Sequence, residues 1–485
     1  NPNLISHAFI QFSPGRFWIS TEGGAGTAPA NVGISAAKSW GVTLLGAGRN
    51  LTLLMGVTLV DSGSDRLIVE LGWFSTVRDM SVQDHTLPTN VLVNGINPGD
   101  YNTIDNVYGY GTGHLVVSDS TEFDVKIVNC TSEYTRGLLR MTGTEFSFKI
   151  DSCQVGASGS GDYAAIDVGS TAFDIRVSNT TVSTAGTDGF RSTGSDNLAL
   201  VGCRFRTLTG VGVAVSGTVL QTVIVGCEFS AATSGIGIYV REPPSISAVM
   251  GHVSILGCTF VAALDYGIRI DPSDSTIEHA AIVANNFNSV DNPIFIDGST
   301  FAAFNSKLVI ADNVFGFPSA STGTAVIYVV GSAGRLARMV SIDGNMIEGH
   351  TFDAIYCALV EDLTVQGNTV VAKAVTAGEA ISVVECDAFL VADNRVRYDV
   401  DPSATTDAIL IDGTYTTGTV QGNRVIPPAG GGTNLRYGIN PASASGSGLL
   451  VVTNDYRGTW GTAGLNTTNT PIVAWSGGAD GENRA

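Results

Sequence analysis

Residues 197–210 read NLALVGCRFRTLTG, residues 221–235 read QTVIVGCEFSAATSG, and residues 252–267 read HVSILGCTFVAALDYG. In each copy, alternating apolar residues lead into a small turn, which a Cys, a polar residue and a Phe follow. Alternation with a period of two is typical of a β-strand with one buried face. The chain therefore repeats one structural unit three times in this stretch.

The same register extends in both directions if Asn is allowed to replace Cys. From Asn106 to Asn454 there are thirteen steps, with a mean of about 27 residues per step. A loose period in this range indicates a solenoid of stacked coils. The positions are Asn106, Cys130, Cys153, Asn179, Cys203, Cys227, Cys258, Asn286, Asn313, Asn345, Asn368, Asn394, Asn423 and Asn454.

Composition agrees with an all-β solenoid. The 485 residues include 59 Gly, only 14% of the residues are charged, and Val, Ile and Thr recur in short alternating runs. No stretch carries helical periodicity, and no apolar run approaches the length of a membrane helix. We expect three short strands per coil, with the Asn side chains of successive coils forming a buried hydrogen-bonded ladder.

The opening of the chain points to a known superfamily. Residues 12–20 (FSPGRFWIS) and 40–54 (WGVTLLGAGRNLTLL) resemble the first coils of the pectate-lyase-like superfamily. The resemblance implies an all-β, right-handed, single-stranded parallel β-helix, here of about 15 coils. We expect an N-terminal cap with the first coils in residues 1–60, a β-helix body in residues 61–455 and a C-terminal cap or tail in residues 456–485.

The formal net charge is −19, which weighs against partners that need a basic surface. We therefore predict no nucleic acid partner and no membrane insertion. An acidic polysaccharide would also be repelled by the chain as a whole, and its binding would need a local cluster of arginines.

Cysteine and histidine indicate no metal site and no cofactor. Five of the seven Cys share the repeat register, where neighbouring coils lie close enough for disulfides. Because Asn occupies the same position elsewhere, a stack of buried thiols is the favoured interpretation. The six His are scattered without ligand spacing, and we expect all of them at the surface or in turns.

Aligning the third strands on their Ile pairs predicts one outward column of residues. Two interpretations of its consecutive aromatic members stay open, namely a platform for sugar rings and a contact between subunits. The column consists of Gly237, Arg269, Phe295, Tyr328, Tyr356, Ser382 and Leu410.

Carboxylates follow this column. Asp271 and Asp297 are expected one coil apart, near the separation of the two carboxyls in retaining glycosidases. Glu242 and Asp274 form a second candidate pair, beside Arg241 and Arg269. The competing interpretation of these acids is turn formation, which Asp-Gly and Asp-Pro pairs favour. The known catalytic signatures of enzymes with this fold are not found in the sequence.

The long, loose repeat with Gly-, Ser- and Thr-rich turns and a Trp-bearing tail resembles the β-helix bodies of bacteriophage tailspikes and tail fibres. This resemblance implies a homotrimer in the virion tail that contacts other phage tail proteins, binds a bacterial surface polysaccharide and often cleaves it. The first alternative is a secreted, extracellular polysaccharide lyase, hydrolase or epimerase. The second is a structural virion, surface or filament protein without catalysis.

Overall fold

The computed structural model places most of the chain in short parallel strands, and helices are absent from the residues it describes. It describes all residues except 1–7, 21–31, 36–40, 58–65, 85–91, 120, 145, 159–162, 170–171, 185–187, 242–248, 262–263, 272–275, 299–306, 317–324, 333–336, 374–377, 403–405, 430–433, 443–447, 456–462, 466–471 and 476–485. Accordingly, no helix capable of crossing a membrane occurs in the described ranges.

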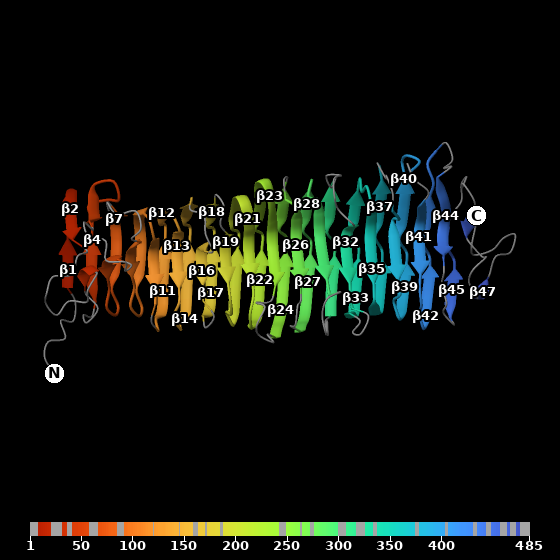
Figure 1. The fold of residues 1–485 in the computed structure, drawn as a ribbon, viewed down its shortest axis with the longest axis horizontal. Coiled ribbons are helices and arrows are strands. Elements are labelled where there is room, and N and C mark those ends of the chain that lie inside the picture. The colour runs from red at the N-terminus through yellow and green to blue at the C-terminus, as the bar shows by residue number, and fades with distance from the viewer. Residues whose placement is uncertain are drawn as a thin grey trace. The chain divides into compact units, whose positions relative to one another are not determined.

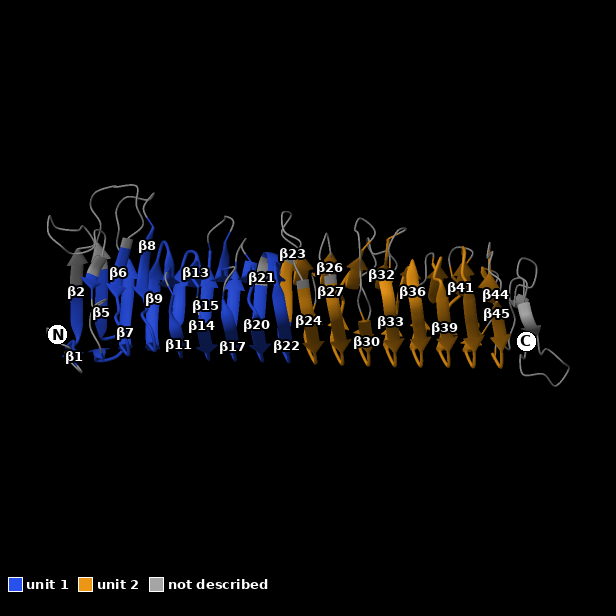
Figure 2. Ribbon diagram, turned by 90° about the horizontal axis from the view of Figure 1, so that it is seen from below, with its two compact units in different colours: residues 1–228 blue, residues 229–485 orange. Residues whose placement is uncertain are grey.

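Two compact units divide the chain, unit 1 at residues 1–228 and unit 2 at residues 229–485 (Figure 2). Within each unit, every coil contributes strands to three parallel stacks (Figure 1). The long strands β7, β9, β21 and β23 bend from one stack into the next. The predicted cap, body and tail stay predictions, although β46 and β47 continue the third and first stacks into residues 463–475.

The first stack precedes the Cys or Asn turn. In unit 1 its strands are β1 (Ala8–Gln11), β4 (Val42–Leu45), β7 (Thr76–Asp84), β9 (Thr103–Gly111), β11 (Phe123–Val128), β14 (Phe146–Asp151), β17 (Phe173–Ser178), β20 (Asn197–Val201) and β22 (Val219–Val225). In unit 2 they are β24 (Val249–Leu256), β27 (Thr276–Val283), β30 (Lys307–Ala311), β33 (Ala337–Asp343), β36 (Val360–Gln366), β39 (Ala388–Ala392), β42 (Thr417–Gln421), β45 (Leu449–Val452) and β47 (Ile472–Trp475).

The second stack follows that turn. In unit 1 it holds β2 (Gly15–Ser20), β5 (Thr52–Val57), the ends of β7 and β9, β12 (Thr131–Tyr134), β15 (Gln154–Ala157), β18 (Thr181–Thr184) and the start of β21 (Arg204–Val215). In unit 2 it holds the start of β23 (Glu228–Arg241), whose residues from Phe229 belong to this unit, then β25 (Thr259–Val261), β28 (Asn286–Asn288), β31 (Val314–Gly316), β34 (Met346–Glu348), β37 (Thr369–Ala372), β40 (Arg395–Tyr398) and β43 (Arg424–Ile426).

The third stack closes each coil. In unit 1 it holds β3 (Val32–Ser35), β6 (Arg66–Glu70), β8 (Val93–Asn97), β10 (His114–Ser118), β13 (Gly137–Met141), β16 (Ala164–Val168), β19 (Asp188–Ser192) and the end of β21. In unit 2 it holds the end of β23, β26 (Tyr266–Asp271), β29 (Asn292–Asp297), β32 (Ala325–Val330), β35 (Asp353–Ala358), β38 (Ile381–Val384), β41 (Thr406–Asp412), β44 (Leu435–Pro441) and β46 (Ala463–Leu465).

This arrangement confirms the predicted all-β parallel β-helix with its period of about 27 residues, and the number of coils differs slightly from the predicted number. Alternate side chains of each strand point into the coil, as in β30, where Leu308 and Ile310 are fully buried. Neighbouring strands pair residue for residue, which stacks like side chains in columns.

The predicted asparagine ladder runs through the interior of unit 2. Asn313 donates from Nδ2 to Asn345 Oδ1 (2.9 Å) and to the Ile282 carbonyl oxygen (2.9 Å), and its backbone N–H donates to the same Asn345 Oδ1 (3.0 Å). The contact repeats from each coil to the next as far as Asn454. The ladder therefore satisfies buried amide groups that no water reaches.

Three predicted members of the repeat register miss the interior position by one residue: Asn106 and Asn179 lie one residue too early, and Asn286 lies one residue too late. Asn106, Asn179 and Asn286 do not point into the coil, and their neighbours Val107, Thr180 and Asn285 occupy the interior position. The reason is the turn itself, in which a residue of left-handed conformation precedes the interior one. Asn106 and Asn179 are these left-handed residues, with φ of 54° and 49°.

The cysteine interpretation is confirmed, since all seven thiols are free and buried. Burial raises the pKa of the Cys130 thiol well above its ordinary value, which makes this thiol unreactive. The expectation for histidine is wrong at His114, which is buried in β10. His350 is also buried, but it lies in the turn segment between β34 and β35.

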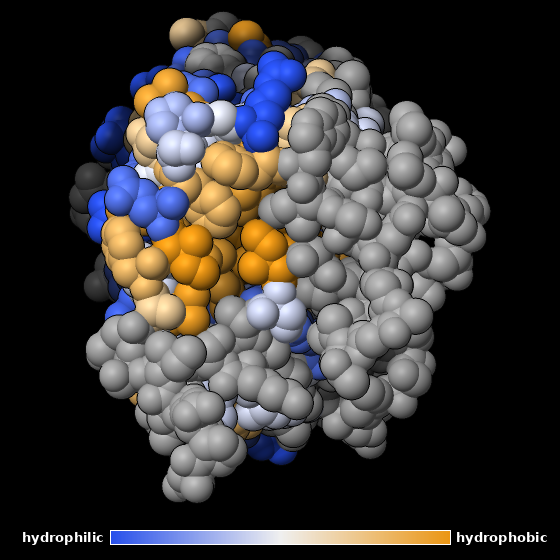
Figure 3. Space-filling view, turned by 90° about the vertical axis from the view of Figure 1, so that its left-hand side faces the viewer, coloured by the Kyte–Doolittle hydropathy of each residue, from blue (hydrophilic) through white to orange (hydrophobic). Residues whose placement is uncertain are grey.

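The end of unit 1 that carries β1 shows apolar side chains among polar ones (Figure 3). Phe9 is 63% exposed and Ile10 is 45% exposed, because β1 pairs with β4 on one side and is the first strand of its stack. Among the described residues, the first coil therefore leaves apolar surface open.

Candidate functional site

A row of rings follows the outward position of the third stack in unit 2. Strand register places Arg269 beside Phe295, Phe295 beside Tyr328, and Tyr328 beside Tyr356. The rings of Phe295 and Tyr328 are nearly parallel with centroids 4.7 Å apart, and those of Tyr328 and Tyr356 are 5.3 Å apart. We call Tyr239, Arg269, Phe295, Tyr328 and Tyr356 the aromatic row.

Two members of the predicted outward column, Gly237 and Ser382, do not belong to it. Tyr239, not Gly237, pairs with Arg269, because the inward residues of β23 are Ile238 and Val240 rather than the preceding Ile pair. At the other end, Ser382 is buried. The aromatic row therefore ends at Tyr356.

Arg269 joins the row through its guanidinium group. This group lies 5.2 Å from the Tyr239 ring centroid and 4.9 Å from that of Tyr266, within the range of cation–π contacts. Its Nη2 and Nε atoms lie 2.7 and 2.8 Å from Asp271 Oδ2, which also accepts a hydrogen bond from the Tyr239 hydroxyl (2.8 Å). Asp271 thus fixes the orientation of Arg269.

The predicted carboxylates lie along the same edge, as far as the structure describes them. The β26 and β29 strands pair up to Ile270 and Ile296, so Asp271 and Asp297 follow on neighbouring strands. Arg241 pairs with Asp271 on the adjoining strand and is exposed. The second predicted pair, Glu242 and Asp274, lies outside the described residues.

The stacking within the row determines what it can offer to a ligand. Tyr328 has both ring faces covered, one by Phe295 and the other by Tyr356. The half-exposed surface therefore consists of ring edges and hydroxyl groups. Burial, with the charges of Asp297 and Tyr356, raises the pKa of Tyr328 to about 12, so its hydroxyl stays a hydrogen-bond donor at neutral pH.

Beyond the row, three acidic residues occupy equivalent positions on successive coils, and sequence analysis missed them. Because β35, β38 and β41 pair at Ile355, Ile381 and Ile409, the residues two positions earlier also align. These residues are Asp353, Glu379 and Asp407, which we call the carboxyl ladder.

Asp353 and Glu379 are hydrogen-bonded neighbours on successive coils. The backbone N–H of Glu379 donates to Asp353 Oδ1 (2.7 Å), and Ser382 Oγ donates to Glu379 Oε2 (3.5 Å). Burial and the nearby charges of Asp353 and Asp407 raise the pKa of Glu379 to about 8, and burial also raises the pKa of Asp353. At neutral pH, Glu379 is therefore mainly a protonated acid.

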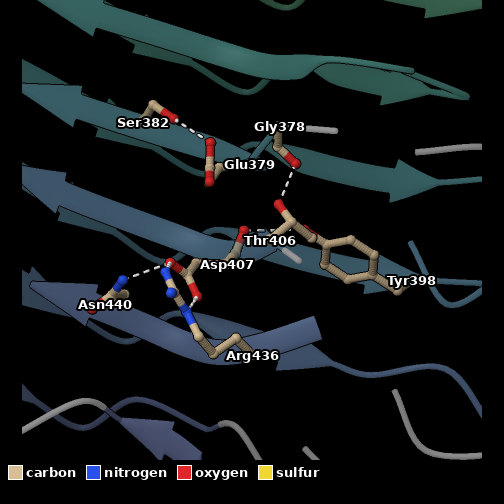
Figure 4. Close-up of polar contacts among 8 residues, drawn as sticks. All are labelled: Gly378, Glu379, Ser382, Tyr398, Thr406, Asp407, Arg436 and Asn440. Carbon is tan, nitrogen blue, oxygen red and sulfur yellow. Dashed lines mark hydrogen bonds and ion pairs between the residues drawn. The ribbon is translucent and has the colours of Figure 1, made fainter. Parts of the chain in front are cut away.

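The third acid is neutralised by its own partners (Figure 4). The buried carboxylate of Asp407 accepts hydrogen bonds from Arg436 Nε (3.1 Å) and Nη2 (2.7 Å) and from Asn440 Nδ2 (2.5 Å). The Tyr398 hydroxyl lies against the Asp407 carbonyl oxygen (3.4 Å). The fork thus supplies both carboxylate oxygens of Asp407 with charged or polar donors.

A signal for the carboxyl ladder is present in the sequence. At the start of the third strand, the three coils read Asp353-Ala-Ile, Glu379-Ala-Ile and Asp407-Ala-Ile, with the acid at or just before the first strand residues. An acid at the same offset in three successive coils must stack, because the coils pair in register. A strand that is taken to begin at its first apolar residue does not include the acid immediately before that residue.

No curated protein matches the sequence. Among solved structures, the chain is similar to the mannuronan C-5 epimerase AlgE4 A-module of Azotobacter vinelandii, with 12% identity, 96% of this chain and 90% of that chain covered, and a TM-score of 0.27. The catalytic unit of a GH87 α-1,3-glucanase from Streptomyces thermodiastaticus has 13% identity, 95% and 65% coverage, and a TM-score of 0.25.

A tailspike protein mutant of E. coli bacteriophage HK620, in complex with a pentasaccharide, has 11% identity to this chain. The match covers 87% of this chain and 71% of that chain, and its TM-score is 0.21. Similarities at these scores carry no argument about function. Residues 137–301 match the family described as "Right handed beta helix region", in agreement with the coils and strand register seen here.

Proposed function

We propose that this chain binds a polysaccharide along the aromatic row of unit 2. The observation that carries the proposal is the half-exposed stack of Phe295, Tyr328 and Tyr356, with Arg269 held beside it. A glycan is an extended ligand with many hydroxyl groups, and it needs a long surface that offers both apolar edges and hydrogen-bond donors. The tyrosine hydroxyls and the Arg269 guanidinium supply the donors.

The geometry changes the expected mode of contact. Because the ring faces cover one another, a sugar cannot lie flat on Tyr328, and the row would instead bind through its edge. The hydroxyls of Tyr328 and Tyr356 would donate to sugar oxygens, which gives the row directional contacts rather than a flat apolar platform.

Replacing both Tyr328 and Tyr356 by Ala is expected to weaken glycan binding at least tenfold, or about 1.4 kcal/mol. An array of bacterial surface polysaccharides would identify a ligand, and calorimetry would then compare the variants. Tyr110→Ala is the matched control, since this tyrosine of unit 1 is 51% exposed and outside the row. Unchanged affinity in the double variant would contradict the proposal.

Sedimentation of the same double variant tests the competing interpretation of the row. If the wild-type chain is an oligomer that falls apart when both rings are removed, the row is a subunit contact. A stable oligomer with reduced affinity supports glycan binding.

Cleavage of the glycan is a second candidate function, favoured by the carboxyl ladder. A carboxylic acid that keeps its proton at pH 7 can donate it to a glycosidic oxygen, and Glu379 meets this condition. Asp353 and Tyr356 lie on the same strand, β35, and the charge of Asp353, after burial, contributes to raising the pKa of Tyr356. The predicted acids Asp271 and Asp297, with Glu242 and Asp274, remain the alternative catalytic set.

We further propose that the chain is a tailspike-like component of a virion tail, or otherwise an extracellular protein. This assignment rests on the resemblance of the long, loose repeat to tailspike bodies. It implies a homotrimer, other phage tail proteins as partners and a bacterial surface polysaccharide as the ligand. A trimer in solution favours the spike over a secreted polysaccharide lyase, hydrolase or epimerase, and continuous head-to-tail assembly favours a structural filament.

A further inference from the structure

Unit 1 contains a basic pocket that shares no residue with the aromatic row or the carboxyl ladder. It is an open pocket of about 500 Å³ over β10, β13, β16 and β19. Three arginines, one histidine and one tyrosine line it, together with a single carboxylate. These residues are Arg136, Arg140, Arg191, His114, Tyr163 and Asp167.

The pocket has an excess of positive charge. Arg191 is neutralised by Asp167, with Nε to Oδ1 at 3.0 Å and Nη2 to Oδ2 at 2.8 Å. Arg136 and Arg140 are half-buried, and neither has an ion-pair partner within the described part of the chain. Two uncompensated guanidinium groups in one pocket are notable in a chain whose net charge is −19.

Packing holds the first of these arginines in place. The Arg136 guanidinium lies 5.0 Å from the Tyr163 ring centroid, and the His114 ring meets the same tyrosine edge-on at 6.3 Å. Arg140 is beside Asp167 in the strand register, and Asp167 is beside Arg191. The arginines are thus positioned by rigid strands and by a buried ring, as a binding site requires.

His114 adds a buried, uncharged polar group to the pocket. It is 1% exposed and lines the pocket, and its Nε2 atom has no hydrogen-bond partner among the described residues. Burial and the charges of Arg136 and Arg140 lower the pKa of His114 to about 3. The ring is therefore neutral, and its Nε2 atom is a buried polar atom available to pair with a ligand group.

We infer that this pocket binds an acidic sugar, with its anionic group on Arg136 and Arg140 and a hydroxyl group paired with His114 Nε2. Guanidinium groups pair strongly with planar or tetrahedral oxyanions, so a carboxylate, a sulfate ester and a phosphate ester share the required chemistry. The single carboxylate, Asp167, is occupied by Arg191 and does not cancel the charge that the ligand would meet. The site does not depend on glycan binding in unit 2.

Calorimetry with trigalacturonate, a sulfated disaccharide and neutral maltotriose tests this site on the full chain. We expect at least one of the two acidic probes to bind at least tenfold more tightly than maltotriose, and the tighter one identifies the anion. The Arg136→Gln/Arg140→Gln variant should lose that tenfold preference while keeping its melting temperature, because neither arginine is ion-paired. Equal affinities for the acidic and neutral probes would overturn the inference.

The matched control is Arg78→Gln/Arg204→Gln, which removes the same charge from exposed arginines of unit 1. Its preference for the acidic probe should equal that of the wild type, and an equal loss in both double variants would attribute the effect to overall charge and contradict a local site. His114→Phe should weaken binding of the acidic probe about fivefold at unchanged salt dependence, as expected for one lost hydrogen bond. Unchanged affinity would remove His114 from the site.

Discussion

Replacing Asn285 by Ala is expected to destabilise the protein by about 3–5 kcal/mol, whereas Asn286→Ala is expected to change its stability by less than about 0.5 kcal/mol. The two residues are neighbours and chemically identical. Asn285 is 1% exposed inside the coil, and Asn286 is exposed on the outside.

The difference follows from the hydrogen bonds of the ladder. Asn285 Oδ1 accepts from the Cys258 backbone N–H (2.8 Å), and Asn285 Nδ2 donates to the Ile255 carbonyl oxygen (3.0 Å) and to Asn313 Oδ1 (3.0 Å). Alanine at this position leaves these buried partners without Asn285, and each buried group left unsatisfied costs roughly 1–3 kcal/mol. The space left by the carboxamide is too enclosed for these groups to reach bulk water.

Equilibrium unfolding in urea measures both variants against the wild type. The midpoint should fall strongly for Asn285→Ala and stay unchanged for Asn286→Ala. The register expected from the sequence places Asn286 inside the coil. Similar losses of stability in the two variants would therefore show that the interior position is not Asn285 alone. A fall of the urea midpoint in Asn286→Ala alone would support the register expected from the sequence.

This pair also illustrates how far sequence analysis reaches. The period of the repeat, the parallel coils and the ladder chemistry could be predicted, because every coil must bury an apolar face and satisfy an interior polar group. The one-residue error at Asn106, Asn179 and Asn286 could not be avoided by counting. It depends on which residue takes the left-handed conformation at the turn, and a backbone angle is set by the packed coil.

The aromatic row was predictable for a similar reason. Phe295, Tyr328 and Tyr356 each sit between two inward apolar residues (Ile, Val or Cys), so alternation alone places them outside. Their ring-on-ring stacking was not predictable, and it reverses the expected use of their faces. The raised pKa of Glu379 was also beyond sequence analysis, because it depends on burial and on two acids that are distant in the chain.

Replacing Glu379 by Gln is expected to stabilise the protein at pH 9 and to leave it nearly unchanged at pH 5. The pKa of Glu379 is about 8 in the folded chain, against an ordinary value of 4.5. Below pH 4.5 the carboxyl is protonated in both states, and between 4.5 and 8 only the unfolded chain releases its proton. The folded wild type therefore loses stability as the pH rises through this window, by an amount on the order of a few kcal/mol.

Glutamine removes this loss because it cannot ionise, while its amide still donates a hydrogen bond toward Asp353. Unfolding curves at pH 5, 7 and 9 should therefore converge for the two proteins at low pH and diverge at high pH. Glu361→Gln is the matched control, since Glu361 is exposed and lies outside the carboxyl ladder. Parallel pH profiles for wild type and Glu379→Gln would contradict the raised pKa.

A cleavage assay on the glycan ligand separates a catalytic role of Glu379 from a structural one. If Glu379 is the general acid, the Gln variant should lose cleavage by at least about 100-fold although it is the more stable protein, and wild-type cleavage should fall above pH 8 as the acid loses its proton. Asp271→Asn/Asp297→Asn should then retain cleavage. The reverse pattern, with cleavage lost only in the double Asp variant, would assign catalysis to the edge beside Arg269. The proton held by Glu379 would in that case serve only to let two half-buried acids on successive coils lie side by side without two negative charges.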